Sequence, residues 1–172
     1  DGNPLFQFVL PNEREALARQ KIREFIATNL EGRKQVDALI GLPDRATAQD
    51  FLPLIRTYLS ESNLPVAFAV LRMDRHKKAI ARYGKEPCLE LLKHVVHCCR
   101  STFRSEDMIF ALSDSTLGLL MVDLSRESAR VVFNRLRWNI RSNRLNFGGK
   151  PDFSITTSVV FDMLSPANSA SL

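Results

Sequence analysis

Two polar clusters that could carry chemistry stand at opposite ends of one predicted hairpin. The apolar runs at residues 108–112 and 117–122 predict two strands, and the Ser-Asp-Ser-Thr cluster at residues 113–116 predicts the tight turn that joins them. Arg104 and Asp107 precede the first strand in the pattern Arg-x-x-Asp. The turn at the tip of the hairpin and the charged pair at its base are therefore the two candidate sites.

Metal and disulfide chemistry find little support in the sequence. The side chains that could supply them are His76, His94, His97, Cys88, Cys98 and Cys99. No spacing among the histidines matches a metal signature, and two of the cysteines are adjacent, which is a poor disulfide framework. On a helix face such cysteines are small buried hydrophobes. We therefore expect that the protein binds no metal and no other cofactor. We also expect that it resides in the reducing cytoplasm.

Length and charge limit the class of protein. A chain of 172 residues can form one domain with a proper core plus an appendage. No apolar run approaches the length of about 18 residues that a membrane span needs. The N-terminus has no signal-peptide pattern, so we expect an internal piece of a longer protein. The net charge of +5 permits an anionic partner such as a nucleotide, a nucleic acid or a membrane surface, without choosing among them.

Residues 1–36 predict an N-terminal segment that continues into a long helical stalk or linker. Between residues 12 and 39 the chain is rich in helix formers with apolar residues at helical spacing, and Gly32 interrupts the pattern. This helix either packs on the domain's own core or pairs with a second copy as a coiled coil. Residues 165–172 predict a frayed tail.

The remaining pattern predicts an α/β fold with a mostly antiparallel central sheet flanked by helices. The expected helices cover residues 47–60, 74–83, 86–103 and 125–143, and the other expected strands cover residues 65–73 and 153–161. The continuous apolar run at 65–73 predicts a central strand buried on both faces. Pro53 predicts an irregularity near the start of its helix, Gly84 a helix end, and Ser125 an N-cap.

Three segments carry a family resemblance. Residues 37–45, DALIGLPDR, resemble the motif D-x-L-T-G-L-P-N-R that opens the GGDEF domain, the domain of diguanylate cyclases, which join two GTP molecules into cyclic di-GMP. Residues 71–84 are similar to that family's D-x-D-x-F-K-x-I-N-D-x-(F/Y)-G, and residues 111–117 stand where R-x-G-G-D-E-F belongs. The resemblance covers residues 37–162 and implies a GGDEF domain at residues 37–164 with a nucleotide-cyclase palm-like fold.

The same resemblance implies that the cyclase chemistry is lost. Such a cyclase holds two divalent cations on carboxylates beside the triphosphate. Here Arg72 replaces the first metal aspartate, while Ile80 and Leu89 stand at the guanine-reading positions. The degenerate signature consists of Ser113, Asp114, Ser115, Thr116 and Leu117. Asp74 and Lys77 persist. We expect no cyclase activity and no metal.

The base of the hairpin matches a second site of the family. Arg104-x-x-Asp107 stands at the position of the R-x-x-D motif that binds the product as an inhibitor, and the sequence Asn-Arg-Leu-Arg around Arg135 resembles the E-R-L-R that completes this site. An arginine fork can grip guanine O6 and N7, and an aspartate can accept from the guanine N–H groups. We assign Arg104 to one guanine, Asp107 to the guanine donors and Arg135 to a guanine or phosphate, with Arg100 adding positive charge.

These assignments predict a cyclic di-GMP receptor, a pseudo-enzyme that forms a homodimer around the ligand and reports to other domains of a larger signalling protein. The alternative is a ligand-free dimerisation or protein-docking domain, in which Arg104 and Asp107 form an exposed ion pair and Arg135 is a solvated residue. RNA binding is a third possibility, but the sheet strand at 65–73 offers no aromatic stacking pair. We expect neither DNA binding nor a membrane span.

Overall fold

The computed structural model describes residues 40–62, 64–104, 106–143 and 155–164, together with Gln20, Glu24 and Thr28. Apart from these three residues, which are helical and exposed, the predicted stalk lies outside the described residues, as does the predicted tail at 165–172. The elements are α2 (Arg45–Ser62), β1 (Val66–Met73), α3 (His76–Tyr83), α4 (Lys85–Thr102), β2 (Met108–Ser113), β3 (Thr116–Val122), α5 (Arg126–Ser142) and β4 (Thr157–Leu164).

The strands form one four-stranded sheet in the order β2-β3-β1-β4, and all three pairings are antiparallel. The apolar run of β1 lies between β3 and β4, so the prediction of a central strand is confirmed. Strands β2 and β3 form the predicted hairpin, with a register shift between Ala111 and Ser113 just before the turn. The predicted fold class, a mostly antiparallel sheet flanked by helices, is confirmed.

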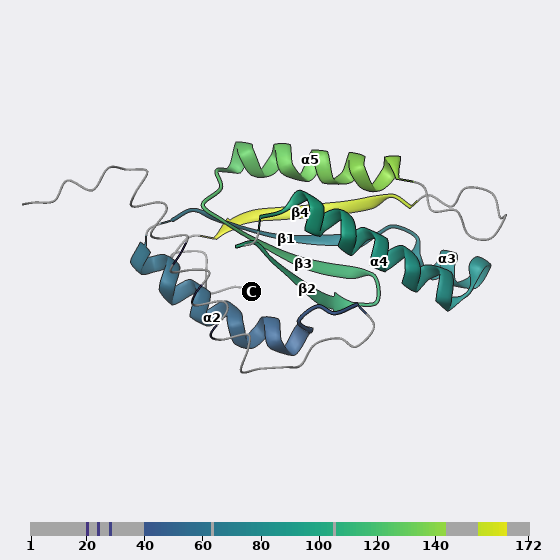
Figure 1. Cartoon of the computed structure of the whole chain (residues 1–172), viewed down its shortest axis with the longest axis horizontal. Coiled ribbons are helices and arrows are strands. Elements are labelled where there is room, and N and C mark those ends of the chain that lie inside the picture. Colours follow the sequence, from purple (N-terminus) through teal and green to yellow (C-terminus); the bar gives the residue numbers. More distant parts are fainter. Residues whose placement is uncertain are drawn as a thin grey trace, which may run out of the picture.

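Helices cover both faces of the sheet (Figure 1). On one face, α4 and α5 pack on β1 and β3 around the fully buried Leu71, Leu119, Val95 and Leu136. On the other face, α2 places Phe51 and Ile55 against a second apolar cluster of the sheet. Alternate residues of β1 and β3 point to opposite faces, so both strands contribute to both clusters. The hairpin is thereby held from two sides.

Several local signals act as the sequence predicts. The hydroxyl of Ser125 accepts a hydrogen bond from the N–H of Ser128 and caps α5, and Gly84 ends α3 with φ +93°, its N–H donating to the carbonyl of Ile80. The bounds of two elements, α2 and the last strand, differ from the prediction. The helix α2 begins at Arg45 and ends at Ser62, so Pro53 lies well inside it rather than near its start.

The last strand is also displaced. It covers Thr157–Leu164, beyond the predicted end at residue 161, because the ladder with β1 pairs Val66 with Leu164 and Met73 with Thr157. The length of β1 therefore sets the length of β4, which its own alternation could not show. All three cysteines are buried free thiols. Among the described helices, none is long and apolar enough to cross a membrane.

Candidate functional site

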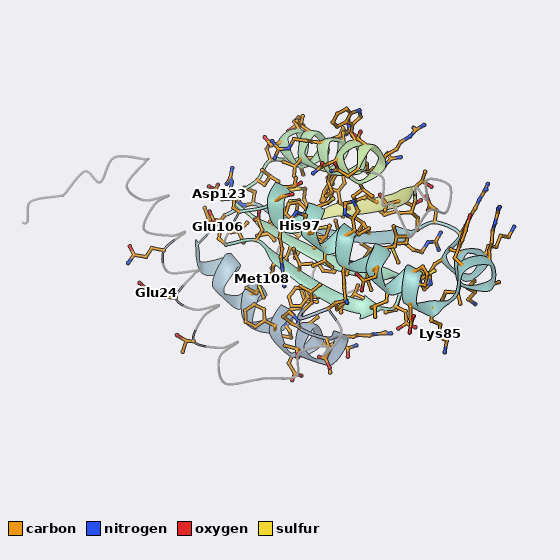
Figure 2. All side chains as sticks on the ribbon, turned by 45° about the vertical axis from the view of Figure 1, so that its right-hand side comes forward. Glu24, Lys85, His97, Glu106, Met108 and Asp123 are labelled. Atoms are coloured by element: carbon orange, nitrogen blue, oxygen red, sulfur yellow. The ribbon has the colours of Figure 1, made fainter. Side chains whose placement is uncertain are left out.

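A cavity of about 480 Å³ lies at the base of the hairpin, between the end of α4, the turn before β2, the end of β3 and the first half of α5. It is lined by Thr102, Arg104, Asp107, Met121, Val122, Leu124, Glu127, Ser128, Val131, Val132 and Arg135. Figure 2 shows Glu106 and Asp123, which are the chain neighbours of Asp107 and Val122, at this end of the sheet and Lys85 at the other. Three predicted site residues, Arg104, Asp107 and Arg135, thus share one cavity.

Reciprocal hydrogen bonds fix Arg104 and Asp107 relative to one another. The N–H of Arg104 donates to Oδ2 of Asp107 at 2.9 Å, and the N–H of Asp107 donates to the carbonyl of Arg104 at 3.2 Å. The other carboxylate oxygen, Oδ1, accepts from the N–H of Val122 at 3.4 Å. The spacing of three residues therefore closes a turn between α4 and β2 and ties that turn to the end of β3.

The carboxyl group of Asp107 is largely desolvated. Burial raises its pKa above the ordinary value, and the carboxylate of Glu106 adds to the rise; the N–H groups of Arg104 and Val122 and the charge of Arg104 oppose it. The guanidinium of Arg104 is exposed, and within the described part of the chain it has no hydrogen-bond or ion-pair partner. The half-buried carboxylate of Asp107, a hydrogen-bond acceptor, thus lies next to the guanidinium of Arg104, whose N–H donors are not engaged by the described residues.

Arg135 reaches the cavity from α5. Its Nη2 donates to the carbonyl of Thr102 at 3.3 Å, in the last turn of α4, where a positive charge is favourable. The ring of Phe133 meets that of Phe103 edge to face, with centroids 6.5 Å apart, so α5 and the end of α4 are also joined by aromatic packing. These contacts hold Arg135 over the turn that contains Arg104.

Arg100 is not among the residues that line this cavity. Its Nη2 donates to the carbonyl of Gly41 at 3.1 Å and so connects α4 to the loop that precedes α2. The first turn of α5 adds to the cavity two polar residues that the sequence analysis did not single out, Glu127 and Ser128. Ser128 precedes Arg135 by seven residues on one helix face, and this spacing could have revealed it.

The tip of the hairpin is built differently. Ser113 and Asp114 are exposed, and the carbonyl of Ser115 accepts from the N–H of Met73 at 2.8 Å. Arg72, also exposed, pairs in register with Thr116 on one side and with Ser158 on the other. The predicted signature residues therefore lie beside the end of β1.

Asp74, next to the tip, is already engaged. Its two carboxylate oxygens accept from the hydroxyls of Thr156 and Ser158, each at 2.7 Å. Although partial burial opposes ionisation, these hydroxyls and the charges of Arg72 and Arg137 hold the pKa of Asp74 below its ordinary value. Across residues 40–62, 64–104, 106–143 and 155–164, no group of three His, Cys, Asp or Glu residues could hold a metal ion.

A sequence model of the family described as "Diguanylate cyclase, GGDEF domain" matches residues 34–169, most of the chain. The chain belongs to the GGDEF family. Among curated proteins it is 24% identical over 104 residues to the probable diguanylate cyclase DgcT of Escherichia coli K12, which covers 60% of this chain. The chain spans only 22% of the length of that relative.

Solved GGDEF structures share the fold. The GGDEF domain of DgcB from Caulobacter crescentus, in complex with c-di-GMP, superposes with a TM-score of 0.73 at 17% identity, covering 78% of this chain and 80% of that one. The diguanylate cyclase SiaD of Pseudomonas aeruginosa, in complex with its activator SiaC, superposes with a TM-score of 0.75 at 20% identity, covering 92% of this chain and 60% of that one. In this GGDEF domain, the cavity at the hairpin base and the signature segment lie at opposite ends of β2 and β3.

Proposed function

We propose that this GGDEF domain is a catalytically inactive receptor for cyclic di-GMP in a larger cytoplasmic signalling protein. The observation that carries the proposal is that Arg104 and Asp107, from the turn between α4 and β2, and Arg135, from α5, line one cavity of about 480 Å³. A cavity of this size falls within the range of small-molecule sites. The bound DgcB domain of the same fold supports the choice of ligand.

The groups in this cavity complement a guanine. Arg104 presents an unengaged planar fork that can donate two parallel hydrogen bonds to O6 and N7. Asp107 accepts one backbone hydrogen bond on each oxygen, and a carboxylate has about four acceptor positions, so two remain for the guanine N–H groups. Val131 and Val132 provide apolar surface for the face of the base.

Arg135 supplies a second cation for the phosphodiesters or for a second guanine. Among the residues that the structure describes, the one partner of its guanidinium is the carbonyl of Thr102, bound by Nη2, so the rest of its fork can still donate. A stacked pair of ligands bound between two such surfaces would join two copies of the domain. The N-terminal segment of the chain would then carry the change of association to the other domains.

The tip of the hairpin supports the absence of catalysis. Arg72 places a positive charge where the resemblance requires a metal carboxylate, and Coulomb repulsion opposes a cation there. The retained Asp74 has its two oxygens occupied by Thr156 and Ser158. In an assay with GTP and Mg²⁺, we expect no cyclic di-GMP to form, and turnover that is abolished by Asp74→Asn would contradict this part of the proposal.

Titration calorimetry with cyclic di-GMP tests the receptor directly. We expect micromolar binding to the wild-type domain and a loss of about 10- to 100-fold in Arg104→Ala, since removing one charged bidentate contact costs roughly 1.5–3 kcal/mol. Arg130→Ala is the matched control, because Arg130 is an exposed arginine of α5 outside the cavity. Absence of binding, or equal binding by the two variants, would refute the receptor.

The second candidate function is a ligand-free dimerisation or protein-docking domain. Val131 and Trp138 of α5 are 68% and 70% exposed, seven residues apart on one helix face, and exposed aromatic residues are typical of interfaces. SiaD, which has the same fold, was solved with a protein activator. This candidate predicts no thermal shift with any guanine nucleotide, unchanged self-association in Arg104→Ala, and loss of association in Trp138→Ala.

A further inference from the structure

The outward side of α5 is basic, and within the described part of the chain no other helix or strand covers it. Figure 1 shows α5 as the uppermost element, with its inner side over the sheet. The inner side packs into the core through four apolar residues, Ala129, Phe133, Leu136 and Ile140. The exposed residues of the helix include one acidic residue, Glu127, and five arginines, which are Arg126, Arg130, Arg135, Arg137 and Arg141.

Four of these arginines form a row along one side of α5. The arginine row consists of Arg126, Arg130, Arg137 and Arg141. Intervals of four, seven and four residues return to the same side of a helix, so the row is about 22 Å long. Arg126 forms an ion pair with Asp162 of β4. Arg137 donates from Nε to the carbonyl of Thr157 at 3.2 Å, and the other two arginines have no hydrogen-bond or ion-pair partner among the described residues.

Two exposed apolar residues lie beside the arginine row. Val131 and Trp138 are 68% and 70% exposed, and each directly follows an arginine of the row. They are seven residues apart, which is the spacing of successive a positions in a heptad repeat, and Arg130 and Arg137 then hold the g positions. Charges at g positions select the partner helix. An apolar centre with tryptophan and arginine is also typical of protein interfaces.

The charge of this surface limits what can cover it. A second copy of α5 would bring an equally basic row, and residues 1–39 carry six acidic and six basic residues, so neither is complementary. The phosphates of a nucleic acid would pair with the row but leave Val131 uncovered. Two outward apolar residues are too few for insertion into a bilayer, which needs a whole apolar helix face.

We propose that the outward side of α5 docks an acidic amphipathic helix of a partner protein. The apolar residues of that helix cover Val131 and Trp138 at heptad spacing, and its carboxylates pair with the arginine row, where the guanidinium fork matches a carboxylate. Of the two apolar residues and the row, only Val131 also lines the cavity assigned to cyclic di-GMP. The docking surface and the receptor site can therefore be tested separately.

The fluorescence of Trp138 gives a direct measurement, because this is the single tryptophan of the chain. The probe is a synthetic helix of about three heptads without tryptophan, with leucine at a and d and glutamate at e and g. At pH 7.5 we expect it to shift the emission of Trp138 to shorter wavelength, with a dissociation constant of about 10–100 μM. The same helix with lysine at e and g is expected to bind at least about tenfold more weakly.

Charge reversals locate the docking surface. Arg130→Glu combined with Arg141→Glu is expected to weaken binding of the glutamate helix about five- to tenfold. Both side chains are exposed and without a described partner, so the fold stays intact. Lys78→Glu combined with Lys85→Glu is the matched control on α3 and α4, with unchanged binding. Trp138→Ala, followed by titration calorimetry, is expected to weaken binding at least about tenfold.

The outcomes are separate from those of the receptor. Arg104→Ala is expected to bind the glutamate helix like the wild type, whether or not the domain binds cyclic di-GMP. No emission shift, equal binding of the two synthetic helices, or unchanged binding in the double variant of the row would overturn the proposal. A shift that grows with protein concentration alone would identify a second copy as the occupant. Tighter, steeply salt-dependent binding of oligouridine would identify a nucleic acid instead.

Discussion

The polar residues at the two ends of the β2–β3 hairpin differ in how firmly the rest of the fold holds them. At the base, Asp107 joins the end of α4 to the end of β3 through backbone hydrogen bonds, and Arg135 joins α5 to α4. At the tip, Asp114 is exposed on a turn and makes no described contact of this kind. Polar residues at the base therefore have a structural role beside any binding role, whereas a residue at the tip can change at little cost in stability.

The largest expected loss of stability comes from the apolar cluster between β2 and α2, which supports both ends of the hairpin. Phe110 is 0% exposed in β2 and belongs to the cluster that packs against α2. We expect Phe110→Ala to lower the free energy of unfolding by about 3–5 kcal/mol, through lost burial and the cavity left behind. Urea denaturation followed by circular dichroism measures it. A loss below about 1 kcal/mol would mean that α2 does not support the hairpin.

Two aspartates compare the ends directly. Asp107→Ala leaves the N–H groups of Arg104 and Val122 without an acceptor, and we expect it to lower the free energy of unfolding by about 1–3 kcal/mol. Asp114→Ala is the matched change at the tip, with an expected effect within about 0.5 kcal/mol. Both follow from urea denaturation. Equal losses in the two variants would contradict the comparison.

The N-cap of α5 is a second structural feature of the base of the hairpin, because α5 positions Arg135 in the cavity there. Ser125→Ala removes the side-chain acceptor of the Ser128 N–H, and we expect a loss of about 1 kcal/mol in stability. Ser142→Ala, at the exposed end of the same helix, is the control with an expected change within about 0.5 kcal/mol. Thermal unfolding of the two variants measures the difference. The same midpoint in both would show that the cap is not needed.

The smallest expected effect is that Asp74 and Asp107 make the stability of the domain depend on pH with opposite signs. Asp74 has a lowered pKa, so its contribution to stability is present above the ordinary aspartate pKa and is lost as the pH falls through its lowered value. Asp107 has a raised pKa, so the folded state holds its proton more tightly, and stability falls as the pH rises from the ordinary value through the raised one. Carbon-detected NMR titration of the side-chain carboxyls measures both. If Asp107 titrated below Asp74, the two environments would be wrongly assigned.

Local patterns made most of the fold predictable. The turn cluster at residues 113–116, the long apolar run of β1 and the cap at Ser125 each act through neighbours in the sequence, and each stands in the structure as predicted. The end of β4 was not predictable in this way, because the ladder with β1 determines it. Pro53 misled for a similar reason, since packing of Phe51 and Ile55 sustains α2 on both sides of the proline.

The candidate site divides in the same manner. The sequence by itself determined the family motifs, the hairpin and the charged residues at its base, because these depend on residue type and short spacing. Only the tertiary structure decided that Arg104, Asp107 and Arg135 share a cavity with Glu127, while Arg100 binds the carbonyl of Gly41 instead. The physical reason is that long side chains find their partners across elements that only the packed core brings together, and spacing along the chain does not record those distances.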